Sequence, residues 1–324
     1  MDTIEKVTSG GEIDLSVELG PLKLKTPIIA ASGTFGYGIE YEGLADFSAY
    51  GAIILKAVSL EPRRGNPPPR IVETPAGMLN CIGLENPGVE AFIKEKLPRA
   101  ARLGVPLIAN LVGERVKDYV RLAEILDGEN ALVALEINAS CPNVEHGYSM
   151  FSTTPSAIEE LVKEVRKATK KPLIVKLSPN VTDIVPLAKA SLEAGGDILD
   201  LCNTFLGMSI CIETGHSRLS RDYGGLSGRA IRPLALRIVH QAVSATNAPI
   251  IGTGGIYETS DAIEFFIAGA RAVSLGTVQF IHPDQARKIV DELNAYLKTR
   301  GISLNQLIGS YRGPACVNHS DDLP

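Results

Sequence analysis

Short apolar runs alternate with longer amphipathic segments along most of the chain. The apolar runs are rich in β-branched residues and hydrophobic on both faces, which is typical of parallel strands covered by helices. The pattern predicts strands over 27–31, 52–58, 106–111, 132–137, 173–177, 198–202, 249–252 and 272–275. It predicts helices over 156–169, 181–194, 230–245, 260–268 and 284–298. This strand-then-helix order predicts an α/β fold, a closed (β/α)8 TIM barrel, as a single domain over 1–324.

Two connections are too long to be simple turns. One covers 59–86 and is rich in Pro and Gly, and the other covers 205–228. Long excursions from a compact domain usually carry function. We therefore expect inserted loops over the C-terminal face of the barrel, where barrels of this kind have their active sites.

Composition excludes several classes of protein. The 324 residues are 45% hydrophobic and carry a net charge of −5 with scattered basic residues, which argues against a nucleic-acid partner. The five cysteines form no C-x-x-C pair, so we expect no disulfide framework and no metal or iron–sulfur centre in this chain. The sequence shows neither a signal peptide nor an apolar run of about 18 residues, which predicts a cytoplasmic protein without a membrane span.

Polar residues recur at the ends of the predicted strands. In chain order they are Ser32, Gly33, Lys56, Asn110, Asn138, Lys176, Asn203 and Thr204. Burying such groups unpaired is costly. Each alone could be a hydrogen-bonded core asparagine or a lysine that reaches water. Together they favour one flat ligand with carbonyl and N–H groups, because asparagine donates and accepts whereas lysine only donates.

Glycine-rich turns follow the last two predicted strands. Gly254 and Gly255 come after the seventh, and Gly276 and Thr277 after the eighth; Gly228 could join them. Glycine lets backbone amides approach an anion, and these loops commonly bind phosphate in such barrels. A flat ligand with a phosphate indicates FMN, with Lys176 stabilising the negative charge of the reduced ring. A nicotinamide fingerprint after the first strand is lacking.

Cys141 follows the fourth predicted strand in the run NASCPN, 138–143. A thiol just beyond a buried strand, level with the other polar strand ends, is a candidate acid or base. The alternative is a small buried residue without chemistry.

These motifs resemble the class 1 dihydroorotate dehydrogenases over nearly the whole chain. The matching runs are SGTFGYG (32–38), NCIGLENPG (80–88), NASCPN (138–143) and GGLSG (224–228), with the turns at 254–256 and 276–277. The segment 212–214 and the run into 224–228 are most similar to the NAD-linked heteromeric type, class 1B. In that type a second subunit carries FAD and a 2Fe-2S cluster.

The resemblance implies a role for each matching residue. FMN would be held by Ser32, Gly33, Lys56, Asn110, Asn138, Lys176, Cys202, Gly228, Gly254, Gly255, Gly276 and Thr277. The pyrimidine would be held by Lys56, Asn80, Cys81, Ile82, Gly83, Leu84, Asn138, Asn203 and Thr204. Cys202 and Cys81 depart from the commoner pattern, in which an aliphatic and a small residue stand there.

The implied reaction is oxidation of (S)-dihydroorotate to orotate in de novo pyrimidine (UMP) biosynthesis. Cys141 would remove the C5 proton while hydride passes from C6 to flavin N5. Electrons would then reach NAD through the partner subunit, in an assembly built as a homodimer core or a heterotetramer.

Other functions stay open from sequence alone. Within enzymes, they are a fumarate-linked dihydroorotate dehydrogenase without a partner and a dihydropyrimidine dehydrogenase-like flavoenzyme. In other classes, they are a flavin-free phosphate-binding TIM barrel and a non-enzymatic flavin-binding protein. The last two leave Cys141 unexplained.

Overall fold

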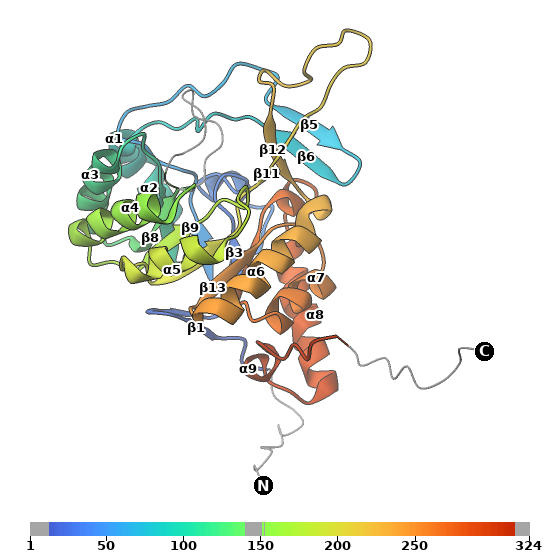
Figure 1. The fold of residues 1–324 in the computed structure, drawn as a ribbon. Coiled ribbons are helices and arrows are strands. Elements are labelled where there is room, and N and C mark those ends of the chain that lie inside the picture. Colours follow the sequence, from blue (N-terminus) through green and yellow to red (C-terminus); the bar gives the residue numbers. More distant parts are fainter. Residues whose placement is uncertain (1–12, 140–150, 152, 315–324) are drawn as a thin grey trace.

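The computed structural model describes residues 13–139, 151 and 153–314. Its centre is a closed barrel of parallel strands in the order β10-β13-β14-β3-β4-β7-β8-β9 (Figure 1). The strands are β3 (Ile28–Ala30), β4 (Ala52–Ile54), β7 (Leu107–Leu111), β8 (Leu132–Asn138), β9 (Leu173–Lys176), β10 (Ile198–Leu201), β13 (Ile250–Thr253) and β14 (Ala272–Leu275). Each matches one predicted apolar run, and the predicted TIM barrel is confirmed.

Helices cover the outside of the barrel (Figure 1). The longer ones are α3 (Val116–Asp127), α4 (Pro155–Ala168), α5 (Val185–Glu193), α6 (Arg232–Thr246), α7 (Thr259–Ile267) and α8 (Gln285–Arg300). The shorter ones are α1 (Val89–Ala91), η3 (Phe92–Lys96), α2 (Leu97–Ala101), η1 (Ile39–Tyr41), η2 (Phe47–Ala49), η5 (Arg229–Ile231), η6 (Thr277–Phe280) and α9 (Leu304–Leu307). All five predicted helices are present, with ends shifted by up to a few residues; α3 and most of the shorter helices were not predicted.

Helix α4 shows how local sequence sets these elements. Thr154 caps the helix by accepting a 3.3 Å hydrogen bond from the backbone N–H of Ala157, and Pro155 suits the first turn. Ile158, Leu161, Val162 and Val165 are all buried on one face. This stripe packs the helix onto the barrel.

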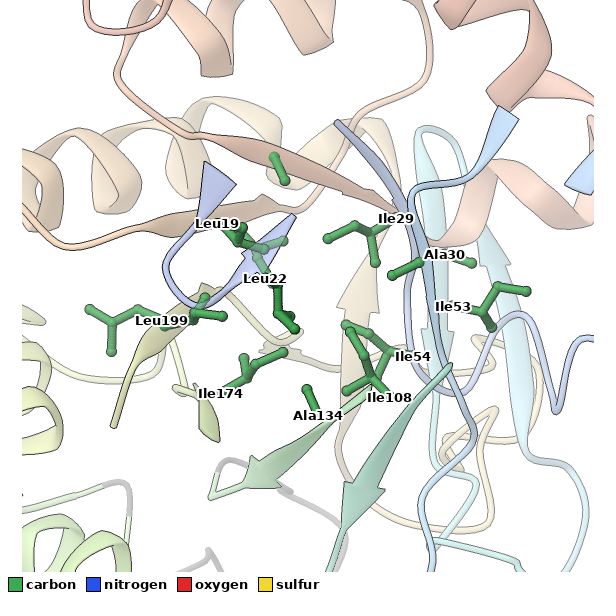
Figure 2. Packing of buried hydrophobic residues seen from close by; sticks show 14 of the residues in the cluster. Leu19, Leu22, Ile29, Ala30, Ile53, Ile54, Ile108, Ala134, Ile174 and Leu199 are labelled. Carbon is green, nitrogen blue, oxygen red and sulfur yellow. The ribbon is translucent and has the colours of Figure 1, made fainter. Parts of the chain in front are cut away.

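A small hairpin closes the amino end of the barrel. It consists of β1 (Val17–Leu19) and β2 (Leu22–Leu24), and Figure 2 shows Leu19 and Leu22 among the barrel side chains Ile29, Ile54, Ile108, Ala134, Ile174 and Leu199. A Cβ at Gly20, in its turn, would lie 3.3 Å from side-chain atoms of Ile198 and Pro249. The hairpin therefore seals the core below the site.

The predicted strand over 52–58 is too long. Regular pairing stops at Ile54, and the Lys56 N–H donates to the carbonyl of Gly36 at 2.7 Å instead of to β7. Pairing returns only at Val58, whose N–H donates to Asn110 O at 2.8 Å. Lys56 thus lies beyond the strand, not within it, and this break sets it on the cavity wall described below.

The two long connections form one extra sheet. Its order is β11 (Phe205–Gly207), β12 (Gly224–Ser227), β6 (Gly77–Asn80) and β5 (Ile71–Thr74), all antiparallel. In Figure 1 this sheet lies at the opposite end of the barrel from β1. The expectation of insertions over the C-terminal face is confirmed. Within the described part of the chain, no helix combines the length and apolar character needed to cross a membrane.

Candidate active site

A cavity of about 690 Å³ lies between the carboxyl ends of the barrel strands and the inserted sheet. This size is ordinary for a site that holds a small molecule or cofactor. Most of the residues predicted from sequence line it: Ser32, Gly33, Lys56, Asn80, Ile82, Gly83, Leu84, Asn110, Asn138, Lys176, Cys202, Asn203, Thr204, Gly228, Gly254, Gly255, Gly276 and Thr277. Segments far apart in the chain therefore meet in one place.

One predicted residue that the structure describes does not line the cavity. Cys81 is fully buried in a separate small cluster with Val72, Leu79 and Leu219, and its Sγ lies 3.5 Å from Ser220 Oγ. Its backbone N–H donates to Arg70 O and its carbonyl accepts from Asn66 Nδ2. Cys81 therefore bonds to neighbouring segments of the inserted loops and packs away from the cavity. Cys141 lies outside the described residues.

Amide side chains from β7 and β8 form part of the cavity floor. Asn110 donates from Nδ2 to Glu136 Oε1 at 2.5 Å, and its Oδ1 accepts from Asn138 Nδ2 at 3.4 Å. The phenol of Tyr119 donates to the Asn138 carbonyl at 2.9 Å. These contacts fix both asparagines, so a ligand meets amide groups whose orientation is already set.

An ion pair is buried beside these amides. Lys176 Nζ lies 2.7 Å from Asp200 Oδ2, and Thr253 donates to Asp200 Oδ1 at 2.5 Å. Burial would lower the pKa of Lys176, but its ion pair with Asp200, aided by the nearby acid Glu136, outweighs burial and holds that pKa above its usual range. The ammonium of Lys176 is therefore a permanent positive charge on the cavity wall.

Glu136 is a second buried carboxyl group, wholly inaccessible to solvent. Burial raises its pKa to about 8, with repulsion from Asp200 adding to the rise and the Lys176 ammonium opposing it. Neither Glu136 nor Asp200 was predicted as a site residue. The available signal was an acid inside an otherwise apolar strand, in the runs LEIN and ILDLC.

The glycine turns make an open cradle at one end of the cavity. A Cβ at Gly255, where φ is +75°, would lie 2.6 Å from the backbone nitrogen of Arg232 in the first turn of α6. A Cβ at Gly276 would meet no described atom closer than 3.9 Å. Thr277 Oγ1 donates to Ser227 Oγ at 2.7 Å, which ties the cradle to β12.

This cradle fits a phosphate. The amino end of a 15-residue helix lies behind Gly255, and helix amino ends attract anions. Arg229 and Tyr257 also line the cavity, with the guanidinium 4.1 Å from the ring centroid. Asn110, Asn138 and Lys176 line a different part of the same cavity, on barrel strands β7, β8 and β9. The donor set thus suits a flat, carbonyl-rich ring with an anionic tail.

The inserted sheet and its loops supply the remaining wall. Asn80 donates from Nδ2 to the Gly225 carbonyl at 3.2 Å, and Asn180 donates to the Thr204 carbonyl at 3.0 Å. Leu84 has a φ of +58°, and its carbonyl accepts from Asn86 Nδ2 at 2.8 Å. The Asn80 and Leu84 contacts hold the two ends of the 80–84 loop, and this loop and Lys56 line the same cavity.

Comparison with known proteins gives consistent matches. The family model described as dihydroorotate dehydrogenase matches residues 14–297. The protein named dihydroorotate dehydrogenase B (NAD(+)), catalytic subunit, from Geotalea uraniireducens is 50% identical over 301 residues, which are 93% of this chain and 99% of that protein. The protein of the same name from Desulforudis audaxviator is 47% identical over 300 residues, 92% of this chain and 98% of that protein.

A solved structure agrees at the level of the fold. The crystal structure of DHODH in complex with ferulenol from Eimeria tenella superposes with a TM-score of 0.78 at 22% identity. The match covers 96% of this chain and 92% of that one. At this identity the likeness concerns the fold alone.

Proposed function

The chain belongs to the dihydroorotate dehydrogenase family, and from this membership we propose that it is an FMN-dependent catalytic subunit oxidising (S)-dihydroorotate to orotate for pyrimidine biosynthesis. We assign its electrons to NAD, through a cytoplasmic partner subunit with FAD and a 2Fe-2S cluster. The observation that carries this proposal is the single cavity that joins a phosphate cradle to a wall of fixed amides and the buried Lys176.

FMN fits the residues present. Gly228, Gly254, Gly255, Gly276 and Thr277 would hold its phosphate end, and Ser32, Asn110, Asn138 and Lys176 would hold its ring. When bound, FMN accepts the hydride that leaves C6 of dihydroorotate. Lys176 stabilises negative charge at this wall, because its pKa lies above its usual range and the side chain stays charged.

The pyrimidine would be oriented by the remaining lining residues. Lys56 and the backbone amides of 82–84 suit its carboxylate, whereas Asn80, Asn138, Asn203 and Thr204 suit its ring carbonyl and N–H groups. Cys141 would take the C5 proton as the C5–C6 double bond forms. A free thiol has a pKa of about 8.5, so we expect activity to rise as Cys141 ionises.

The decisive test uses Cys141→Ala and Cys141→Ser. Wild-type protein should show a flavin spectrum that bleaches when dihydroorotate is added without oxygen. Both variants should keep the spectrum and bleach slower by about 10²–10⁴-fold. A Cys141→Ala protein that bleaches at the wild-type rate would disprove the base assignment. Absence of flavin absorbance, even after adding FMN, would exclude every function that depends on a bound flavin.

The electron acceptor is tested separately. Wild-type protein mixed with dihydroorotate and fumarate should not turn over, whereas co-expression with an iron–sulfur subunit should allow NAD reduction. Size-exclusion chromatography of the chain alone and of that complex shows whether the chain forms a homodimer and whether the complex is a heterotetramer. Rapid fumarate reduction by the chain alone would favour the partner-free type, and oxidation of dihydrouracil in preference to dihydroorotate would favour a dihydropyrimidine dehydrogenase-like enzyme.

A further inference from the structure

Three ionisable side chains meet inside the barrel beside the proposed flavin site. Asp200 on β10 is paired in register with Lys176 on β9, and Glu136 on β8 is paired with Asn110 on β7. Both acids have no solvent exposure, and neither is part of the cavity lining. Lys176 and Asn110 do line the cavity, so each acid contacts a residue that would touch the flavin.

The three groups cannot all be charged without cost, because two carboxylates would face one ammonium in a place without water. Of the two acids, Asp200 is the one whose surroundings better stabilise the ionised carboxylate. Its Oδ2 accepts from the Lys176 ammonium at 2.7 Å and its Oδ1 from Thr253 at 2.5 Å. Both of its oxygens therefore have donors, one of them charged.

Glu136 has poorer support for a negative charge. Its Oε1 accepts from the uncharged Asn110 Nδ2, and its buried Oε2 accepts from no donor among the described residues. The neighbouring carboxylate of Asp200 can only accept, so a hydrogen bond between the two acids requires a proton on Glu136. A proton on Oε2 neutralises this carboxyl group and leaves the Asn110 hydrogen bond intact. Such a proton makes the sum of the three charges zero.

The neighbouring strands leave Glu136 as the group that titrates. The charged or titratable side chains on the strands around it are Lys176 on β9, Asp200 on β10 and Cys202 just after β10. Burial raises the pKa of Cys202 far above its usual range, so it stays a neutral thiol. Asn110 on β7 and Thr253 on β13 carry no charge.

We propose that Glu136 and Asp200 are positioning residues for Lys176, and that Glu136 holds a proton which keeps the barrel interior neutral beneath the flavin. This rests on the proposed function. While Glu136 is protonated, the Lys176 ammonium faces one carboxylate and attracts the negative charge of reduced FMN. Loss of the proton adds a second carboxylate and weakens the binding of reduced FMN relative to oxidised FMN.

The test measures the midpoint potential of bound FMN from roughly pH 6 to 10 in wild type, Glu136→Gln, Asp200→Asn and the control Ser274→Ala. Ser274 is also a buried polar residue of the barrel, on β14, and its Oγ has no hydrogen-bond partner in the described structure. Above about pH 8, the wild-type potential should fall below that of Glu136→Gln. A tenfold change in the ratio of reduced to oxidised FMN affinity equals about 30 mV for this two-electron couple.

In Asp200→Asn the fall in midpoint potential should occur at lower pH, because Glu136 then becomes the counterion of Lys176. Ser274→Ala should follow wild type. If the midpoint potentials of wild type and Glu136→Gln change with pH in parallel, the proposal is overturned. It is also overturned if the fall in potential near pH 8 persists in Glu136→Gln, because that fall would then belong to another group such as Cys141.

A second measurement needs no flavin and no variant. Infrared difference spectra of FMN-free wild type, labelled with ¹³C-glutamate, should show a protonated buried carboxyl band that disappears as pH rises through about 8. Lack of that band would also overturn the proposal. If the chain binds no FMN, the proposed function fails while this band still reports the proton on Glu136.

Discussion

Asn80 donates a 3.2 Å hydrogen bond from Nδ2 to the carbonyl of Gly225, which is 145 residues later in the chain. The bond joins β6 to β12, so the two insertions hold each other over the cavity. A Cβ at Gly225 would lie 2.1 Å from Thr204 Oγ1 and 2.7 Å from Thr204 Cβ. Position 225 therefore needs glycine because Thr204 occupies the adjacent space.

We expect Gly225→Ala to weaken dihydroorotate binding while FMN stays bound. The added methyl group displaces Thr204, and a shift of about 1 Å in a positioning residue can cost about 10²-fold in rate. Steady-state kinetics and the flavin spectrum measure the two effects. Gly128→Ala is the matched control, because it has no described atom within 4 Å of the added Cβ. Equal kcat/KM for both variants would contradict the expectation.

Gly255→Ala should reduce both FMN affinity and stability. At φ +75° an alanine is strained, and its Cβ would lie 2.6 Å from the Arg232 backbone nitrogen. Overpacking of this kind typically costs about 1–3 kcal/mol. Titration of FMN-free protein with FMN, followed by fluorescence, gives the affinity, and urea denaturation gives the stability. Unchanged FMN affinity would mean that this turn is not part of the phosphate site.

Lys176→Met should destabilise the protein more than removal of both charges. It leaves the carboxylate of Asp200, whose side chain is 0% exposed, without its ammonium. Breaking a buried pair this way costs about 3–5 kcal/mol, whereas replacing both partners by apolar residues is often nearly neutral. Urea denaturation of Lys176→Met and of Lys176→Met/Asp200→Leu without FMN makes the comparison. A double variant as unstable as the single one would argue against the ion pair.

Glu136 should make the stability of the protein depend on pH. Its pKa is raised from 4.5 to about 8 on folding, so the folded state binds more protons between these values. Its contribution to stability is therefore full below about pH 4.5 and is lost as pH rises through about 8, at up to about 1.4 kcal/mol per pH unit. Denaturation at several pH values should show that the free energy of unfolding of wild type, relative to that of Glu136→Gln, decreases as pH rises from about 4.5 to about 8. A constant difference would contradict it.

Local sequence was sufficient for the barrel, because each strand is an apolar run that needs helices on its outer face. It was also sufficient for the glycine turns and for the asparagines at strand ends, since these residue types stand out inside apolar runs. The strand break before Lys56 could not be predicted, because it depends on the carbonyl of Gly36, which the loop after β3 brings to the Lys56 N–H.

The linear chain by itself determined the eight strands of the barrel, their order and most of the polar residues at their ends. Only the tertiary structure decided that β6 pairs with β12, that Cys81 points into a separate cluster and that Glu136, Lys176 and Asp200 share one buried space. The reason is physical. Periodicity reports which face of an element is buried, whereas the free energy of a buried charge depends on partners that other strands bring to it.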